Sequence, residues 1–196
     1  NASDGCRWGN DFNDENNNGG TGDPFKENTN QLQKQYKNVD GYGETHWIIE
    51  NYKSNGTTLK DTYTAFYHAN FYGTAESSTE KYAAPSNTTG WFIPGMGQWW
   101  DILSNLGRIN LDEYKNSSSG NASIPDAAPT AVAKINEYLQ KISHATQFST
   151  GTYFWSSSEY NSEGACYVSF NNLGSLILYY NFKDTSDGRV RCIFAF

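Results

Sequence analysis

Apolar residues recur at helical spacing in the first half of the chain. From Thr45, which we expect to act as the cap, the spacing of Trp47 and Tyr52 predicts a helix that ends at Gly56. A second run, over residues 62–71, is helical or mixed. Polar turn residues then separate these two runs from the middle of the chain.

The stretch GWFIPGMGQWWDILSNLG, residues 90–107, combines a strand signal with a helix signal. We expect a short strand over residues 91–93, because Pro94 and Gly95 stop it. A helix follows and ends at Gly107. Its buried face would consist of Trp99, Ile102, Leu103 and Leu106.

A further helix is predicted from Thr130, its expected cap, to about Ala145. Pro129 stands just before it, where proline is tolerated. Its buried stripe would consist of Val132, Ile135, Leu139 and Ile142. The Ser/Asn/Gly-rich residues 108–125 are expected to connect the two helices.

The last quarter of the chain changes to a pattern of strands and turns. Val168 and Phe170 alternate with Tyr167 and Ser169, so the two pairs should face opposite sides of a sheet. Cys166 would share the Val168 side. This alternation is typical of a strand with one face in the core.

A hairpin turn is predicted at residues 171–174, Asn-Asn-Leu-Gly. The run that follows, residues 176–180, is apolar on both faces, and the pattern leaves open which face looks outward. The chain then stops on an apolar strand, residues 190–196.

Composition adds limits on organisation and partners. A length of 196 residues predicts a single domain over 1–196, with a loop-rich part at residues 1–30. The Asn/Asp cluster in that part lacks the spacing of an EF-hand calcium loop. A net charge of −7 disfavours nucleic acid and anionic membrane surfaces as partners. We find no apolar run of membrane length, so we expect no direct membrane insertion.

Catalytic chemistry finds little support in the chain, which lacks GxSxG, a P-loop, a dinucleotide-binding GxGxxG and HExxH. The three histidines, His46, His68 and His144, bring no ligand set with them. Asp101 and Glu159 could form a carboxylate pair, but we interpret both as solvated or capping groups. We therefore expect no enzymatic activity, no cofactor and no metal.

Three cysteines occur, Cys6, Cys166 and Cys192, without a CxxC motif. A disulfide between Cys166 and Cys192 would join two predicted strands, but we favour free thiols, because free buried cysteines are common. Cys192 alternates with Arg191 along its predicted strand and should face the core, where a thiol is inert.

Five stretches carry a resemblance to a known family. GWFIPGMGQWWDILSNLG (90–107) resembles the GW-x-LP…QW…NLG block of bacterial C-type-lectin-like domains of the Fibrobacter succinogenes major-paralogue type. YFWSSSEY (153–160), ACYVSF (165–170) and VRCIFAF (190–196) are similar to that family's C-terminal blocks. NASDGCRWG (1–9) is similar to its N-terminal one.

The resemblance implies an α+β, C-type-lectin-like fold: a small mixed antiparallel sheet with flanking helices and long loops. Some members of the family are variable proteins of diversity-generating retroelements, which diversify a C-terminal segment. The corresponding segment here is 153–196. Variable-looking positions within it are Glu163, Cys166, Leu176, Leu178 and Tyr180.

The chain also departs from relatives with this fold. The EPN or QPD and WND motifs of calcium-dependent sugar binding are absent, and Cys166 stands where the family usually has Trp. Formylglycine-generating enzymes share the fold, but none of their motifs is matched. An enzyme of that class is therefore the least favoured of the hypotheses.

The leading hypothesis is a non-enzymatic, adhesin-like protein at the bacterial cell surface or outside the cell, on a lipoprotein or at a pilus tip. It would bind an unknown protein or glycan on another cell or on a phage or host surface. The alternative is a structural subunit of a pilus or surface assembly. The expected contact residues are Tyr160, Asn161, Glu163, Tyr167, Ser169, Asn171, Asn172, Leu176, Leu178 and Tyr180. Residues 153–157 and 190–196, with Val168 and Phe170, would form the frame.

Overall fold

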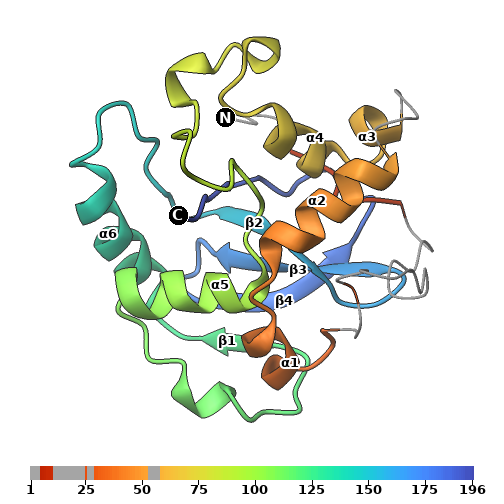
Figure 1. Cartoon of the computed structure of the whole chain (residues 1–196). Coiled ribbons are helices and arrows are strands. Elements are labelled where there is room, and N and C mark those ends of the chain that lie inside the picture. Colours follow the sequence, from red (N-terminus) through yellow and green to blue (C-terminus); the bar gives the residue numbers. More distant parts are fainter. Residues whose placement is uncertain (1–4, 11–24, 26–28, 53–57) are drawn as a thin grey trace.

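The computed structural model describes residues 5–10, 25, 29–52 and 58–196. Within these residues the chain forms a four-stranded antiparallel sheet with helices around it, so the predicted α+β class is confirmed (Figure 1). The strands lie in the order β1 (Ala122–Ile124), β4 (Leu176–Phe182), β3 (Gly164–Phe170) and β2 (Thr152–Glu159). Strand β1 falls in the segment for which the sequence predicted only a connection.

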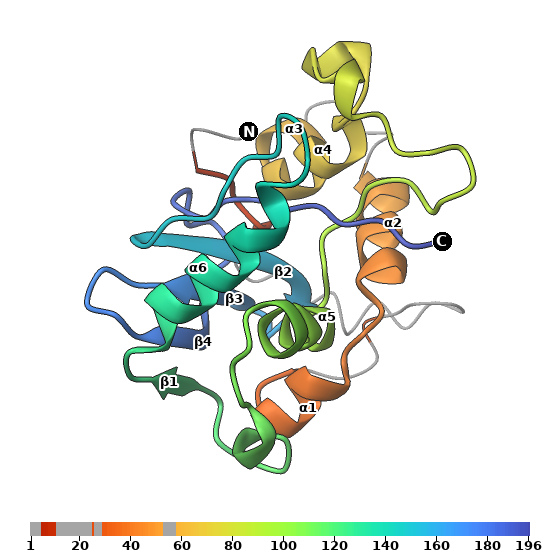
Figure 2. The same cartoon turned by 90° about the vertical axis from the view of Figure 1, so that its left-hand side faces the viewer.

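Helices surround the sheet on two sides. The α-helices are α1 (Leu32–Lys37), α2 (Gly41–Tyr52), α3 (Thr58–Asp61), α4 (Thr64–Phe71), α5 (Met96–Asp101) and α6 (Ala127–Leu139). Short 3-10 turns lie at Ala75–Ser77, Glu80–Tyr82 and Asp112–Tyr114. Figure 2 shows α5 and α6 lying against the sheet, while α2 and α4 lie together further up. No helix in the described part of the chain has the length and apolarity to cross a bilayer.

Two apolar clusters pack against the sheet, one on each face. The first lies between the sheet and helices α5 and α6, and it includes Trp99, Phe154 and Leu178. The second joins α2 and α4 to the N-terminal segment and to the other face of β2 and β3, around Trp8 and Trp155. Strands β2 and β3 are therefore covered on both faces at one end, which explains their long buried stretches.

Helix α2 begins at Gly41, four residues before the predicted start. Thr45 is not a cap: it is buried inside the helix, and its hydroxyl accepts a hydrogen bond from the Ile93 amide. The threonine was misread because its partner lies 48 residues away in the sequence. The predicted end at Gly56 lies outside the described residues. The second predicted run is confirmed as α4.

Helix α5 continues as a π-helix over Ile102–Leu106, and Gly107 follows it as predicted. The Gly107 amide bonds the Ile102 carbonyl, a five-residue spacing that widens the turn. Trp99 and Leu103 are buried, but Leu106 is 36% exposed. Its predicted burial is wrong, because the wider turn rotates Leu106 off the apolar face.

Helix α6 begins at Ala127, so Thr130 lies inside it and is not its cap. Pro129 is in the first turn, where its missing N–H breaks no helical hydrogen bond. The predicted stripe holds for Ile135, which is buried, but Ile142 lies beyond the end of the helix and is 59% exposed. After Leu139 the α-helical bonding gives way to tighter turns, in which the Lys141 and Ile142 amides bond the Tyr138 and Leu139 carbonyls.

The C-terminal segment is not the regular strand that the sequence predicted. It makes isolated bridges between Gly188 and Cys6, between Arg189 and Phe154, and between Ile193 and Phe92. Each bridge has a different partner, so no continuous ladder forms. The predicted strand at residues 91–93 is reduced to the same Phe92–Ile193 bridge.

Candidate ligand-binding face

Strands β3 and β4 present one fully buried face. Its residues are Cys166, Val168, Phe170, Leu176 and Leu178, all with no exposed surface. The predicted alternation along β3 is confirmed, including the placement of Cys166 on the Val168 side. Leu176 and Leu178 are wrong as contact residues, because both pack into the cluster that α5 and α6 cover.

The opposite face carries partly exposed tyrosines on three neighbouring strands. Tyr153 of β2, Tyr167 of β3 and Tyr179 of β4 have ring centroids 4.9 and 6.4 Å apart in succession. Tyr167 and Tyr179 are direct cross-strand partners. Such pairs stabilise a sheet and hold their rings in fixed positions.

The series continues around the end of β4. Tyr179 contacts Tyr180 at 4.7 Å, and Tyr180 stacks on Tyr160 at 4.0 Å with an angle of 11° between the rings. A Cβ atom on Gly164 would lie 2.5 Å from the Tyr180 ring, so glycine leaves the space that this ring occupies. We call Tyr153, Tyr167, Tyr179, Tyr180 and Tyr160 the tyrosine row.

Burial keeps the phenols of four tyrosines of the row, Tyr153, Tyr160, Tyr167 and Tyr180, neutral at physiological pH. Burial raises the pKa of Tyr153 to about 12, opposed by a hydrogen bond from the Asn181 amide. Burial also raises the pKa of Tyr167, Tyr180 and Tyr160. The row therefore offers apolar rings with hydroxyl groups that donate and accept hydrogen bonds.

The polar residues of the predicted contact set take two different positions. The side-chain oxygen of Asn161 accepts bonds from the amides of Glu163 and Gly164 and closes the β2–β3 turn. Asn171 does the same in the β3–β4 hairpin, which confirms that turn. These two asparagines shape turns, so their side-chain oxygens are already engaged.

Other predicted contact residues remain accessible. Glu163 and Asn172 are exposed, and Ser169 is partly exposed beside Tyr153 in the strand register. Tyr160, Tyr167 and Tyr180 belong to the tyrosine row. These six residues do not all share one side of the sheet. Tyr167 and Ser169 lie on the outward face, whereas Tyr180 pairs with Cys166 on the Leu178 side and stacks there on Tyr160.

Sequence reasoning missed Tyr153, which it assigned to the frame, and also Ile177, Tyr179 and Asn181. All four lie on the outward face and are partly exposed. The signal was present in the hairpin: pairing Ser169 with Ile177 puts the odd-numbered residues of both strands on one face. Carrying the alternation of β3 through the turn would have identified Tyr179.

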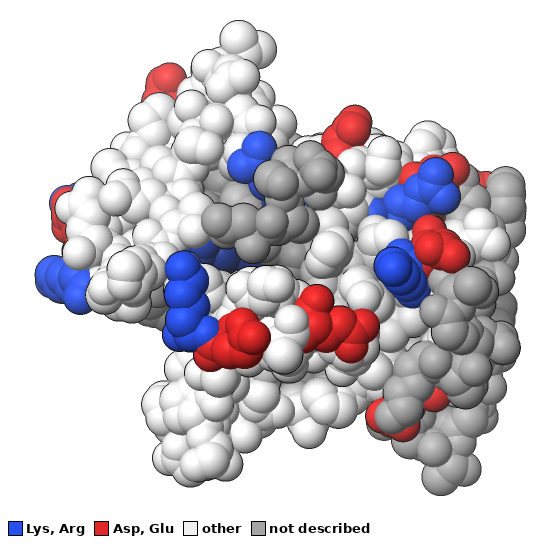
Figure 3. Space-filling view, turned by 90° about the horizontal axis from the view of Figure 1, so that it is seen from above, with Lys and Arg blue, Asp and Glu red and all other residues white. Residues whose placement is uncertain are grey.

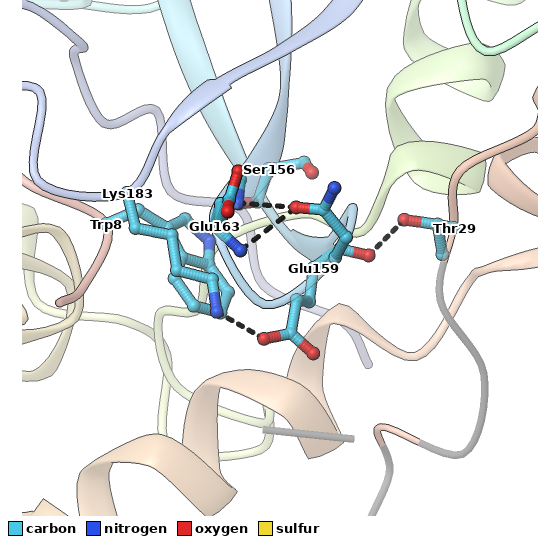
Figure 4. A network of polar contacts seen from close by, with 8 residues as sticks. Trp8, Thr29, Ser156, Glu159, Glu163 and Lys183 are labelled. Atoms are coloured by element: carbon cyan, nitrogen blue, oxygen red, sulfur yellow. Dashed lines mark hydrogen bonds and ion pairs between the residues drawn. The ribbon is translucent and has the colours of Figure 1, made fainter. Parts of the chain in front are cut away.

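A buried ion pair lies under the β2–β3 turn. The Lys183 ammonium pairs with the Glu159 carboxylate, with both side chains almost fully buried, and lies 5.1 Å from the centre of the Trp8 ring (Figure 4). The Glu159 carbonyl accepts hydrogen bonds from Thr29. The expectation of a solvated or capping Glu159 is therefore wrong, because its partner lies 24 residues further along the chain. Asp101 is exposed, as expected.

A second buried carboxylate, Glu44, links α2 to strand β2. It accepts hydrogen bonds from the Ser157 hydroxyl and from the Asn38 amide at 2.7 Å. Burial raises the pKa of Glu44 to about 7, and the nearby charges of Asp40 and Glu159 act in the same direction, against these two hydrogen bonds. This network fixes the position of β2 relative to the helices.

Of the two alternatives for Cys166 and Cys192, a disulfide or free thiols, the structure has free thiols. The Cys166 thiol lies 3.2 Å from the Thr29 hydroxyl. Burial raises the pKa of the Cys166 thiol far above its usual range and that of Cys192 to about 12. Both thiols therefore stay protonated at neutral pH and are poor nucleophiles.

Charged groups of both signs are scattered over the side of the molecule seen from above. Figure 3 shows small mixed groups of acidic and basic side chains separated by uncharged surface.

Comparison with models of protein families, with curated proteins and with solved structures finds no match for this chain.

Proposed function

We propose that this chain is a non-enzymatic, surface-displayed ligand-binding domain with a C-type-lectin-like fold. The small antiparallel sheet and its flanking helices support the proposal. So do the positions of the resembling stretches, because residues 153–160 and 165–170 contain most of β2 and β3. The ligand would be a protein or glycan on another cell or on a phage or host surface.

The observation that carries the proposal is the tyrosine row. Tyrosine supplies a large contact area with few rotatable bonds, which is why it is common in binding surfaces. Here five such rings contact one another in succession and remain partly exposed. Cross-strand pairing and the covered opposite face hold Tyr153, Tyr167 and Tyr179 rigid, and Tyr180 is stacked on Tyr160. Little conformational entropy would therefore be lost on binding.

Burial restricts any diversification of the tail. Of the variable-looking positions, Cys166, Leu176 and Leu178 have no exposed surface, and changes there would disrupt the core. A retroelement would have to act on partly exposed positions such as Tyr179 and Tyr180. A near-identical downstream repeat of the tail, differing at template adenines, beside a reverse-transcriptase gene would support this part of the proposal.

The structural-subunit alternative predicts that the whole tail is core. Leu176 and Leu178 meet that expectation, whereas Tyr167 and Tyr180 are partly exposed. The burial of Leu176 and Leu178 therefore agrees with the alternative, and the exposure of the two tyrosines does not. It predicts self-association without any separate ligand.

The test is a screen of the purified protein on arrays of glycans and of cell-surface proteins, followed by variants. A Tyr167→Ala/Tyr179→Ala variant should lose binding about 100-fold or more while its circular dichroism is unchanged. The control is Tyr42→Ala/Tyr138→Ala, which removes two exposed tyrosines from α2 and α6. Equal binding by both double variants would refute the proposed face.

A further inference from the structure

Two carboxylates lie near the tyrosine row. The negative charge of Glu163, in the β2–β3 turn, contributes to the raised pKa of Tyr180. The negative charge of Asp187, after β4, contributes to the raised pKa of Tyr153. The main chain of Asp187 also bonds the Tyr153 hydroxyl. Both acidic residues are exposed. A ligand lying along the row would therefore meet negative charge near Tyr153 and near Tyr180.

No positive charge on the strands balances these two groups. Strands β2, β3 and β4 contain neither lysine nor arginine. Lys183, just after β4, is buried and directed at Glu159. Arg189 is exposed, but it bridges Phe154 in parallel register and so shares the Phe154 side of the sheet, opposite Tyr153.

The orientation of the rings argues against a flat sugar surface as the ligand. Successive rings from Tyr153 to Tyr180 are inclined by 48°, 67° and 68°, so they do not form a common plane. A flat saccharide surface that covers several rings at once would pack best on coplanar rings, whereas a cation can approach each ring face separately. Charge and ring geometry thus favour the same class of ligand.

We propose that the tyrosine row binds a basic segment of a partner protein, with lysine or arginine side chains against the rings and near Glu163 and Asp187. This inference rests on the proposed function and names the partner class for the same face. Cation–π contacts and the two carboxylates would act together, because each favours the same charge. The chain's net charge of −7 would also attract such a segment.

Fluorescence anisotropy with a labelled decalysine peptide at physiological salt tests the inference, with decaglutamate and cellohexaose as comparison probes. The Glu163→Gln/Asp187→Asn variant should bind decalysine about tenfold more weakly than the parent chain. The matched control is Glu80→Gln/Asp101→Asn, which removes the same amount of charge from exposed positions away from the row. It should change binding less than about twofold.

Two results would overturn the inference. One is equal weakening by both charge variants, which would mean attraction to net charge alone. The other is binding of decaglutamate or cellohexaose with no binding of decalysine. If Tyr167→Ala/Tyr179→Ala then abolished that binding, the partner class would be wrong and the proposed face would stand. If it had no effect, the proposed function would fail as well.

Discussion

The two faces of the sheet use similar residues for opposite purposes. One face, with Leu176 and Leu178, is sealed by α5 and α6 and contributes stability. The other, with Ile177 and Tyr179, is partly open. The run from which all four residues come is apolar throughout, so hydrophobicity alone does not distinguish core from contact surface. Position in the strand register does.

The largest expected effect concerns the ion pair beneath the turn. Lys183→Met removes the ammonium from a buried carboxylate, and we expect the free energy of unfolding to fall by about 3–5 kcal/mol. Equilibrium unfolding in urea measures this free energy. The control Lys134→Met breaks a surface pair with Glu137 and should cost less than about 1 kcal/mol. Similar losses for both variants would mean that the buried pair does not support the sheet.

Neighbouring residues in β4 give the most direct comparison of the two faces. Leu178→Ala should lower the free energy of unfolding by about 3 kcal/mol, because it leaves a cavity in the sealed face. Ile177→Ala should lower it by about 1 kcal/mol, because that side chain is partly exposed. Chemical denaturation of both variants checks this. A larger loss for Ile177→Ala would reverse our assignment of the faces.

Glu44 should make stability depend on pH. Its pKa is raised from 4.5 to about 7 in the folded chain, so folding favours the protonated form. The stabilisation from protonation is complete below about pH 4.5 and is lost as the pH rises through 7. Between pH 5 and pH 8, Glu44→Gln should remove about 2 kcal/mol of this dependence.

Thermal unfolding across that pH range provides the measurement. The control is Glu113→Gln, an exposed carboxylate in the 3-10 turn Asp112–Tyr114, and it should leave the pH profile unchanged. A Glu44→Gln variant with the parent's profile would show that this carboxyl does not set it.

The smallest expected effect concerns the stacked pair of Tyr180 and Tyr160 in the tyrosine row. Gly164→Ala places a methyl group against the Tyr180 ring and should displace it from Tyr160, at a cost of about 1 kcal/mol. Near-ultraviolet circular dichroism should report the altered tyrosine packing. Combined with Tyr180→Ala, the same methyl group has room, so the two costs should not add. Strict additivity would contradict the contact.

Local pattern was sufficient where local residues decide the structure. The alternation of Val168 and Phe170 with Tyr167 and Ser169 predicted both faces of β3, and the turn residues predicted the hairpin. It failed where the partner is distant in sequence. Neither the burial of Glu159 nor the role of Thr45 is visible without the contacts to Lys183 and Ile93.

Short or irregular pairing was the other source of error. Strand β1 has three residues in a Ser/Asn-rich segment, too few to show an alternation. The tail was predicted as a strand from its apolar residues, yet its pairing is divided among three separate partners. In both cases the tertiary structure, rather than local propensity, determines the backbone conformation.

The two long-range bonds at the covered end of β2 bear on how fast this chain can fold. The Trp8 indole donates to the Ser156 carbonyl and the Trp155 indole to the Cys6 carbonyl, across 148 and 149 residues of sequence. Closing loops of that length is entropically costly before any contact is gained. We therefore expect slow folding, with the N-terminal segment docking late. Strand β2, which carries the first tyrosine of the row, would become rigid only in that last step.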